Sequence, residues 1–304
     1  MANTRELRRR IKSVKNTAQI TRAMQMVAAT KMRRAQSQAL NGRPYNFNLN
    51  YALRKLLPLV DIGSHPLLLG NDCKTYGVIL LSTDKSLCGA LNTNIFRMLT
   101  TSVLPSDTYF YTVGKKGRQF IAKTGKNLVA DFENLDVVTF RQAAQLAKLV
   151  ISAYLNKEIG EAYLAYPNFI STLRQEPRLV KLLPVSISDI EYRISEDKND
   201  KQSLRSNDLK RLTINDKQTG EFLFEPDSST LLDFTLNHFI QIKIYQSLLE
   251  TKAAEHSARM VAMQNATDNA LELVDDLSLT YNQTRQSAIT TEILDITTAQ
   301  LALE

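Results

Sequence analysis

The feature that most constrains this fold is a long C-terminal stretch without helix breakers. After Pro226 the chain contains neither Gly nor Pro up to Glu304, a distance of 78 residues. A continuous α-helix of that length would extend about 115 Å at ~1.5 Å per residue. This exceeds the width of any domain that a 304-residue chain can build. We therefore expect the C-terminal helix to leave the body of the protein as a rod.

A hydrophobic seam in this stretch predicts a partner helix. Steps of four and three residues over Leu249–Ala288 fall mostly on apolar side chains. The N-terminal region repeats the pattern over Leu7–Ala39, and the breaker pair Gly42 and Pro44 is expected to stop or kink that helix. Both seams are rich in Ala, which lets two helix backbones approach closely. A first helix packed only on its own domain is the alternative that the pattern alone leaves open.

The two terminal helices should pair antiparallel, because the first runs toward the middle of the chain and the last runs away from it. Their predicted lengths differ, with about 40 residues facing up to 78. At ~1.5 Å per residue, the last helix should therefore project alone beyond the first by tens of ångströms.

The middle of the chain has an α/β pattern. Apolar, β-rich runs alternate with helix-like stretches, which favours a small, doubly wound, Rossmann-like sheet. The expected strands are 76–82, 108–113, 161–166 and 179–185, and the expected helices are 90–103 and 140–156. Residues 195–220 are highly charged and predict a loop or irregular hairpin. The chain divides into an N-terminal helix with its extension (1–60), an α/β foot domain (61–226) and a C-terminal helix (227–304).

The positive charge is concentrated at the N-terminus. The net charge is +7, yet residues 1–43 contain eleven Lys and Arg against a single acid, Glu6. Such a segment suits a nucleic-acid arm, a mitochondrial transit peptide, or a helix enclosed by an acidic partner. Composition alone leaves these three open. No apolar run reaches the roughly 18 residues that span a bilayer, and no secretory signal is visible.

Motifs for catalysis or cofactor binding are absent from the sequence. Gly114–Gly117 and Gly125 lack the spacing of a phosphate loop, and no dinucleotide fingerprint is present. The three histidines are scattered without ligand partners, so we expect neither metal nor cofactor. Cys73 and Cys88 are too few for a disulfide framework and too far apart for a redox pair. The Thr83–Gly89 loop is interpreted as structural, although an enzyme of the doubly wound class remains an alternative.

A family resemblance covers essentially the whole chain. Residues Arg5–Gln36 resemble the N-terminal helix of the gamma subunit of F-type ATP synthases, almost without interruption. Further stretches similar to this family follow in order, at Thr83–Asn92, Gly114–Gly117, Phe222–Asp227, Glu255–Ala270 and Tyr281–Ile293. Because the resemblance begins within the first few residues, we expect a bacterial chain without a transit peptide.

The resemblance implies a noncatalytic rotor in the central stalk of the ATP synthase. Its shaft would stand inside a ring of three alpha and three beta subunits, and its foot would rest on the c ring with the epsilon subunit. The chain would transmit torque for ATP synthesis and regulate ATPase activity and proton flow. It would be a peripheral protein at the cytoplasmic face of the bacterial inner membrane, with no cofactor and no nucleic-acid partner.

The matching motifs also imply roles for individual residues. Arg259, Arg285, Gln286 and Thr290 resemble the family's polar contacts to the beta subunit, and Met24 matches a position where the shaft meets the lower lobe of beta. Basic residues of the first helix would face acidic surfaces of beta: Arg8, Arg9, Arg10, Lys12, Lys15, Arg22 and Lys31. Contacts of the foot with epsilon and the c ring are expected at Phe222, Phe224 and Glu225.

Overall fold

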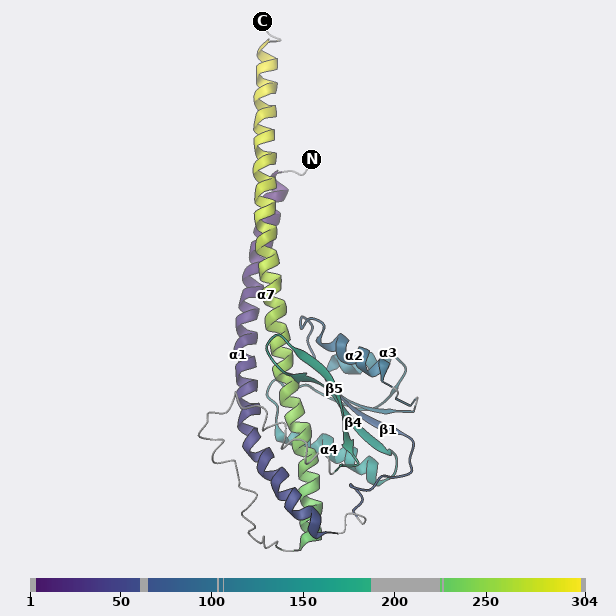
Figure 1. Ribbon diagram of the computed structural model, residues 1–304. Coiled ribbons are helices and arrows are strands. Elements are labelled where there is room, and N and C mark those ends of the chain that lie inside the picture. Colours follow the sequence, from purple (N-terminus) through teal and green to yellow (C-terminus); the bar gives the residue numbers. More distant parts are fainter. Residues whose placement is uncertain are drawn as a thin grey trace.

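The fold is a long two-helix rod standing beside a small α/β domain (Figure 1). The computed structural model describes residues 4–60, 65–102, 104–105, 107–186, 225 and 227–301. Its elements are α1 (Thr4–Leu56), η1 (Leu57–Leu59), β1 (Tyr76–Leu81), α2 (Leu91–Thr101), β2 (Tyr109–Val113), α3 (Lys115–Lys123), β3 (Asn127–Phe132), α4 (Phe140–Leu155), β4 (Glu161–Phe169), β5 (Gln175–Leu183) and α7 (Ser228–Leu301). This architecture confirms the predicted α/β class with an antiparallel helical shaft.

The predicted seam holds the rod together. Alternating four- and three-residue steps place one stripe of each helix against the other. The buried seam residues are Leu7, Ala18, Thr21, Ala28, Met32 and Ala35 on α1, and Ala253, His256, Met263, Thr267, Ala270 and Val274 on α7. Most of these side chains are small, so the rod is thin. The hydroxyls of Thr21 and Thr267 meet across the seam at 2.7 Å, and each also lies within hydrogen-bond distance of a carbonyl of its own helix.

Gly42 and Pro44 were expected to stop or kink the first helix, and the predicted stop was wrong. Helix α1 continues through both residues to Leu56, and its C-terminal part leans across α7 (Figure 1). An internal proline costs about 3 kcal/mol because it removes a hydrogen bond and crowds the preceding turn. Burial of Leu53 and Leu56, at about 1.5–3 kcal/mol each, is enough to offset that cost. Tertiary packing therefore overrides the local signal.

The foot contains a five-stranded sheet in the order β3-β2-β1-β4-β5. Strands β1 to β4 run parallel to one another, whereas β5 runs antiparallel to β4. Neither β3 nor α3 was among the elements predicted from the sequence. Strand β3 lies at an edge and alternates exposed and half-buried residues, so it lacks a continuous apolar run. Helix α3 follows Gly114, whose φ of 100° allows a sharp turn directly after β2.

Helices cover both faces of this sheet, as expected for a doubly wound fold. Helices α2 and α3 pack on one face through Ile95, Leu99 and Ile121. The other face is covered by α4 and by the foot portion of α7, including Leu146 and Ile240. The shaft is thus continuous with the core of the foot, because α7 belongs to both.

Two earlier predictions fall on parts of the chain without a structural description. The charged segment 195–220 lies outside the described residues. The proposed domain boundaries near residues 60 and 226 stay predictions for the same reason, because 61–64 and 226 are also outside them.

Candidate partner-binding surfaces

The end of α7 extends well beyond the start of α1 (Figure 1). Seam positions on α7 are covered as far as Tyr281 and Thr284, and every position from Arg285 to Thr298 is exposed. The 17 residues from Arg285 to Leu301 correspond to about 25 Å of unpaired helix at ~1.5 Å per residue. One end of the rod is therefore a single, asymmetric helix, as the unequal helix lengths predicted.

Three of the predicted beta-contact residues lie on this projecting helix. Arg285, Gln286 and Thr290 are all exposed, and the Thr290 hydroxyl donates to the Gln286 carbonyl at 2.9 Å. Exposed apolar side chains accompany them: Ile289, Ile293, Leu294 and Ile296. A bare helix that presents both guanidinium and aliphatic groups can enter an enclosed partner surface, since isolated helices bury such residues poorly in water.

The other two predicted beta contacts come together some distance below. Met24 of α1 and Arg259 of α7 both line a hollow of about 500 Å³ beside the 83–89 loop. Its apolar part includes Val27 and Leu87, each 56% exposed. Lys31 lies on the rim, where its ammonium group contacts Asp136 at 3.3 Å. This hydrogen bond, together with the charge of Lys31, lowers the pKa of Asp136. The hollow thus combines exposed apolar groups with basic ones.

The Arg259 side chain is largely turned inward and is only 11% exposed. Its guanidinium donates to a carboxylate oxygen of Glu255 at 3.0 Å and to the Ser86 carbonyl at 3.3 Å. The ammonium of Lys252 approaches the other oxygen of Glu255 at 3.5 Å. Lys252 and Glu255 were not among the site residues predicted from the sequence. The signal that could have revealed them is their position: both charged residues lie within residues 251–257 of α7, all of which are buried.

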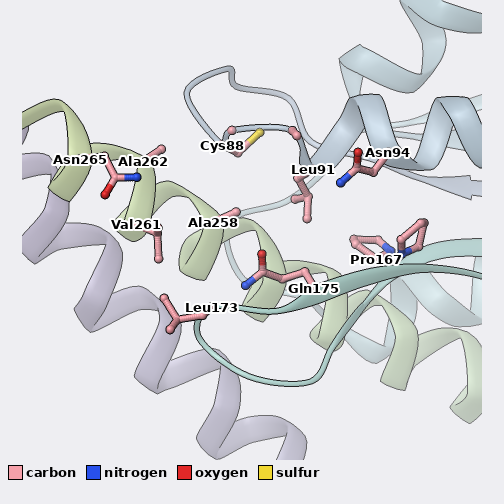
Figure 2. Close-up of a pocket in the computed structure, with 13 residues that line it drawn as sticks. Cys88, Leu91, Asn94, Pro167, Leu173, Gln175, Ala258, Val261, Ala262 and Asn265 are labelled. Atoms are coloured by element: carbon pink, nitrogen blue, oxygen red, sulfur yellow. The ribbon is translucent and has the colours of Figure 1, made fainter.

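A second, smaller hollow of about 240 Å³ lies on another face of α7 (Figure 2). Figure 2 shows side chains from the start of α2, the β4–β5 hairpin and α7 surrounding it, among them Leu91, Leu173 and Val261. Cys88 belongs to this lining, and burial raises the pKa of its thiol despite a contact with the Thr83 hydroxyl. A buried, protonated thiol is a poor nucleophile. The Thr83–Gly89 loop therefore has a structural character.

The predicted foot contacts are only partly described. Glu225 is exposed just before α7, while Phe222 and Phe224 lie outside the described residues. Within the described part of the chain, no group of three or more His, Cys, Asp or Glu side chains is arranged to hold a metal ion. Among those same residues, no helix combines the length and apolar character needed to cross a membrane.

Comparison with known proteins covers the whole chain. The model of the ATP synthase family, "ATP-synt", matches residues 3–303. The ATP synthase gamma chain of Methylacidiphilum infernorum is 42% identical over 308 residues, covering 100% of both chains. The gamma chain of Opitutus terrae is 40% identical over 302 residues, covering 99% of both.

Solved structures with the same fold come from mitochondrial ATP synthases. A chain in the Euglena gracilis mitochondrial ATP synthase (OSCP/F1/c-ring) aligns with a TM-score of 0.66 and 20% identity, covering 99% of this chain and 94% of that one. A chain of the Tetrahymena thermophila central stalk and c-ring structure aligns with a TM-score of 0.59 and 24% identity, covering 81% and 99%. At these identities the likeness supports the fold, whereas the family rests on the curated relatives. The chain belongs to the family of F-type ATP synthase gamma subunits.

Proposed function

We propose that this chain is the noncatalytic rotor of an ATP synthase central stalk, transmitting torque between a proton-driven c ring and an alpha3beta3 head. The observation that carries this proposal is the asymmetric shaft of this chain, which is 42% identical to a known gamma chain and leaves about 25 Å of α7 unpaired at ~1.5 Å per residue. A symmetric rod would present the same surface to all three beta subunits at every angle. An asymmetric one presents a different surface to each, which can bias three identical partners into three states.

The beta subunits would contact the shaft at two heights. Arg285, Gln286 and Thr290 form the upper contact, where the bare helix offers exposed polar groups. Met24 and Arg259 form the lower contact at the 500 Å³ hollow, where the exposed Lys85 offers an acidic lobe of beta a positive charge while Lys31 and Arg259 pair with Asp136 and Glu255. Charge complementarity of this kind guides the approach and the orientation of a partner more than it raises the affinity.

The foot would carry the remaining contacts. Phe222, Phe224 and Glu225 are proposed to face the epsilon subunit and the c ring. Through those contacts the chain would also regulate ATPase activity and proton flow. The complex would hold the chain at the cytoplasmic face of the bacterial inner membrane as a peripheral subunit.

Assembly tests the proposed role directly. Purified chain mixed with alpha and beta subunits should give a 3:3:1 complex in native mass spectrometry. Absence of that stoichiometry under conditions where alpha and beta assemble with a known gamma chain would reject the proposal.

The upper contact can be tested within that complex. The double variant Arg285→Ala/Gln286→Ala should lower ATP turnover and ATP-driven rotation while leaving the melting temperature unchanged, because both side chains are exposed and surface changes are usually within about 0.5 kcal/mol. The matched control is Arg141→Ala/Gln145→Ala, which removes the same exposed residue types from α4 of the foot. Equal turnover in the two double variants would remove Arg285 and Gln286 from the contact.

A further inference from the structure

The shaft crosses the edge of the sheet where doubly wound folds hold their ligands. Strands β1, β3 and β4 are parallel, so the loops that follow them, 82–90, 133–139 and 170–174, emerge at one edge. In open α/β sheets this carboxyl edge is the usual binding crevice. Here α7 passes alongside it (Figure 1). The edge that would cradle a ligand in such an enzyme instead faces a helix of the same chain.

Side chains from two turns of α7 donate to all three of these loops. The Lys252 ammonium reaches the Asn134 carbonyl at 3.4 Å, and the Arg259 guanidinium reaches the Ser86 carbonyl at 3.3 Å. Between them, the Ser257 hydroxyl donates to the Thr172 carbonyl at 2.7 Å. Each acceptor is a main-chain oxygen in a different loop. The foot thus offers carbonyl groups at its carboxyl edge, and the shaft supplies the donors.

Glu255 fixes the two cationic donors in place. Lys252 and Glu255 are 6% and 5% exposed, and the carboxylate lies between the ammonium and the guanidinium of Arg259. Arg259 donates a hydrogen bond to one Glu255 oxygen, whereas Lys252 faces the other oxygen as an ion pair without a hydrogen bond, and this charge pairing keeps the three buried side chains together. Hydrogen bonds depend on direction as well as distance. The arrangement therefore resists turning of α7 relative to the loops.

Helix α1 reaches the same region of the foot. Its Lys31 contacts Asp136, which lies two residues after Asn134 in the 133–139 loop. The Asn134 amide in turn donates to the Ser82 carbonyl at 2.9 Å and so joins this loop to the end of β1. Both helices of the shaft are therefore linked to one loop, and that loop is linked to the central strand of the sheet.

We propose that Lys252, Glu255 and Arg259 form a clasp that fixes the angle of the shaft relative to the foot, a role that rests on the proposed rotor function. Farther down α7, Leu236, Ile240 and Leu248 pack against the foot through apolar, non-directional contacts, and the Lys243 ammonium donates to the Lys181 carbonyl at 3.2 Å. The apolar contacts resist separation more than rotation. The clasp adds directional contacts at the height where the rod leaves the foot, so it should reduce the twisting of α7 relative to the foot under torque.

The test measures torsional stiffness in the assembled complex. A bead is attached to the foot through a cysteine introduced by Lys123→Cys on α3, in a chain that also carries Cys73→Ser. The alpha3beta3 head is fixed to the surface and stalled with a nonhydrolysable nucleotide. The Lys252→Met variant removes the buried cation but retains the length of the side chain. It should widen the angular distribution of the bead, and Lys252→Arg should narrow it again toward the parent width.

A control and a second variant separate the possible outcomes. Lys148→Met makes the same chemical change at an exposed position of α4 and should keep the parent width. The double variant Lys252→Met/Glu255→Gln removes the carboxylate together with the ammonium, so no unpaired Glu255 charge remains. It should also widen the angular distribution of the bead. Parent-like widths in both Lys252→Met forms, or equal widening in Lys148→Met, overturn the clasp. Loss of the 3:3:1 complex in the parent chain instead overturns the rotor proposal.

Discussion

Replacing His256 with Gln should flatten the pH dependence of folding stability between about pH 4 and 6.5. His256 occupies a buried seam position of α7. Burial lowers the pKa of its imidazole from 6.5 to about 4; the neighbouring cations Lys252, Arg259 and Lys31 act in the same direction, and Glu255 opposes them. The folded protein therefore keeps this histidine neutral where an unfolded chain would protonate it.

The sign and size of the effect follow from that difference. Between about pH 4 and 6.5 the unfolded state binds more protons, so stability rises with pH across this window and falls as the solution is acidified through it. Lowering the pKa of His256 from 6.5 to about 4 corresponds to roughly 3.5 kcal/mol at ~1.4 kcal/mol per pKa unit. Because solvent screens part of the seam, we expect the parent chain to lose about 2 kcal/mol on this account by pH 4.

Denaturant unfolding of the full chain, followed by circular dichroism from pH 4 to 8, measures this loss. The His256→Gln variant should lose about 2 kcal/mol less than the parent over the acid part of the range. His238→Gln is the matched control, since it removes an imidazole from a partly exposed position of the same helix. If His256→Gln loses as much stability on acidification as the parent, burial of this imidazole is not the cause.

Two further predictions concern packing. Leu53→Ala, at a fully buried position beyond the Pro44 bend, should cost about 2–5 kcal/mol in chemical denaturation; a loss below 1 kcal/mol would mean that this part of α1 does not contribute to the core. Thr21→Val and Thr267→Val should each lower the free energy of unfolding by about 1 kcal/mol. The double variant should lose less than the sum of the two single losses, because the two hydroxyls bond to each other at 2.7 Å. Strict additivity of the two losses would argue against that bond.

The shaft could be predicted from sequence because its determinants are local and repeated. Seam residues such as Ala28 and Val274 recur at helical spacing, and the absence of Gly and Pro after residue 226 fixes the length of α7. Each repeat adds the same information, so single exceptions matter little. The unequal reach of the two helices followed directly from counting residues.

The remaining errors arose where tertiary contacts outweighed local signals. Gly42 and Pro44 were expected to stop or kink α1, but burial of Leu53 and Leu56 carries the helix past both residues. Strand β3 gains its place from pairing with β2, which no pattern within residues 127–132 reveals. The pairing of Lys252 with Glu255 and the carbonyl of Asn134 joins residues 118 positions apart, and spacing along the helix does not indicate that the partner is a loop of the foot.

The use of main-chain carbonyls as acceptors has a consequence for how such a chain can vary. The oxygen atoms contributed by Ser86 and Thr172 are present whatever side chains those positions carry. Substitutions in these two loops can therefore accumulate without removing an acceptor, provided the backbone path is kept. The donors Lys252, Ser257 and Arg259 have no such freedom, because their contribution is the side chain itself. Among descendants of this sequence, the foot loops should drift faster than the two turns of helix that they hold.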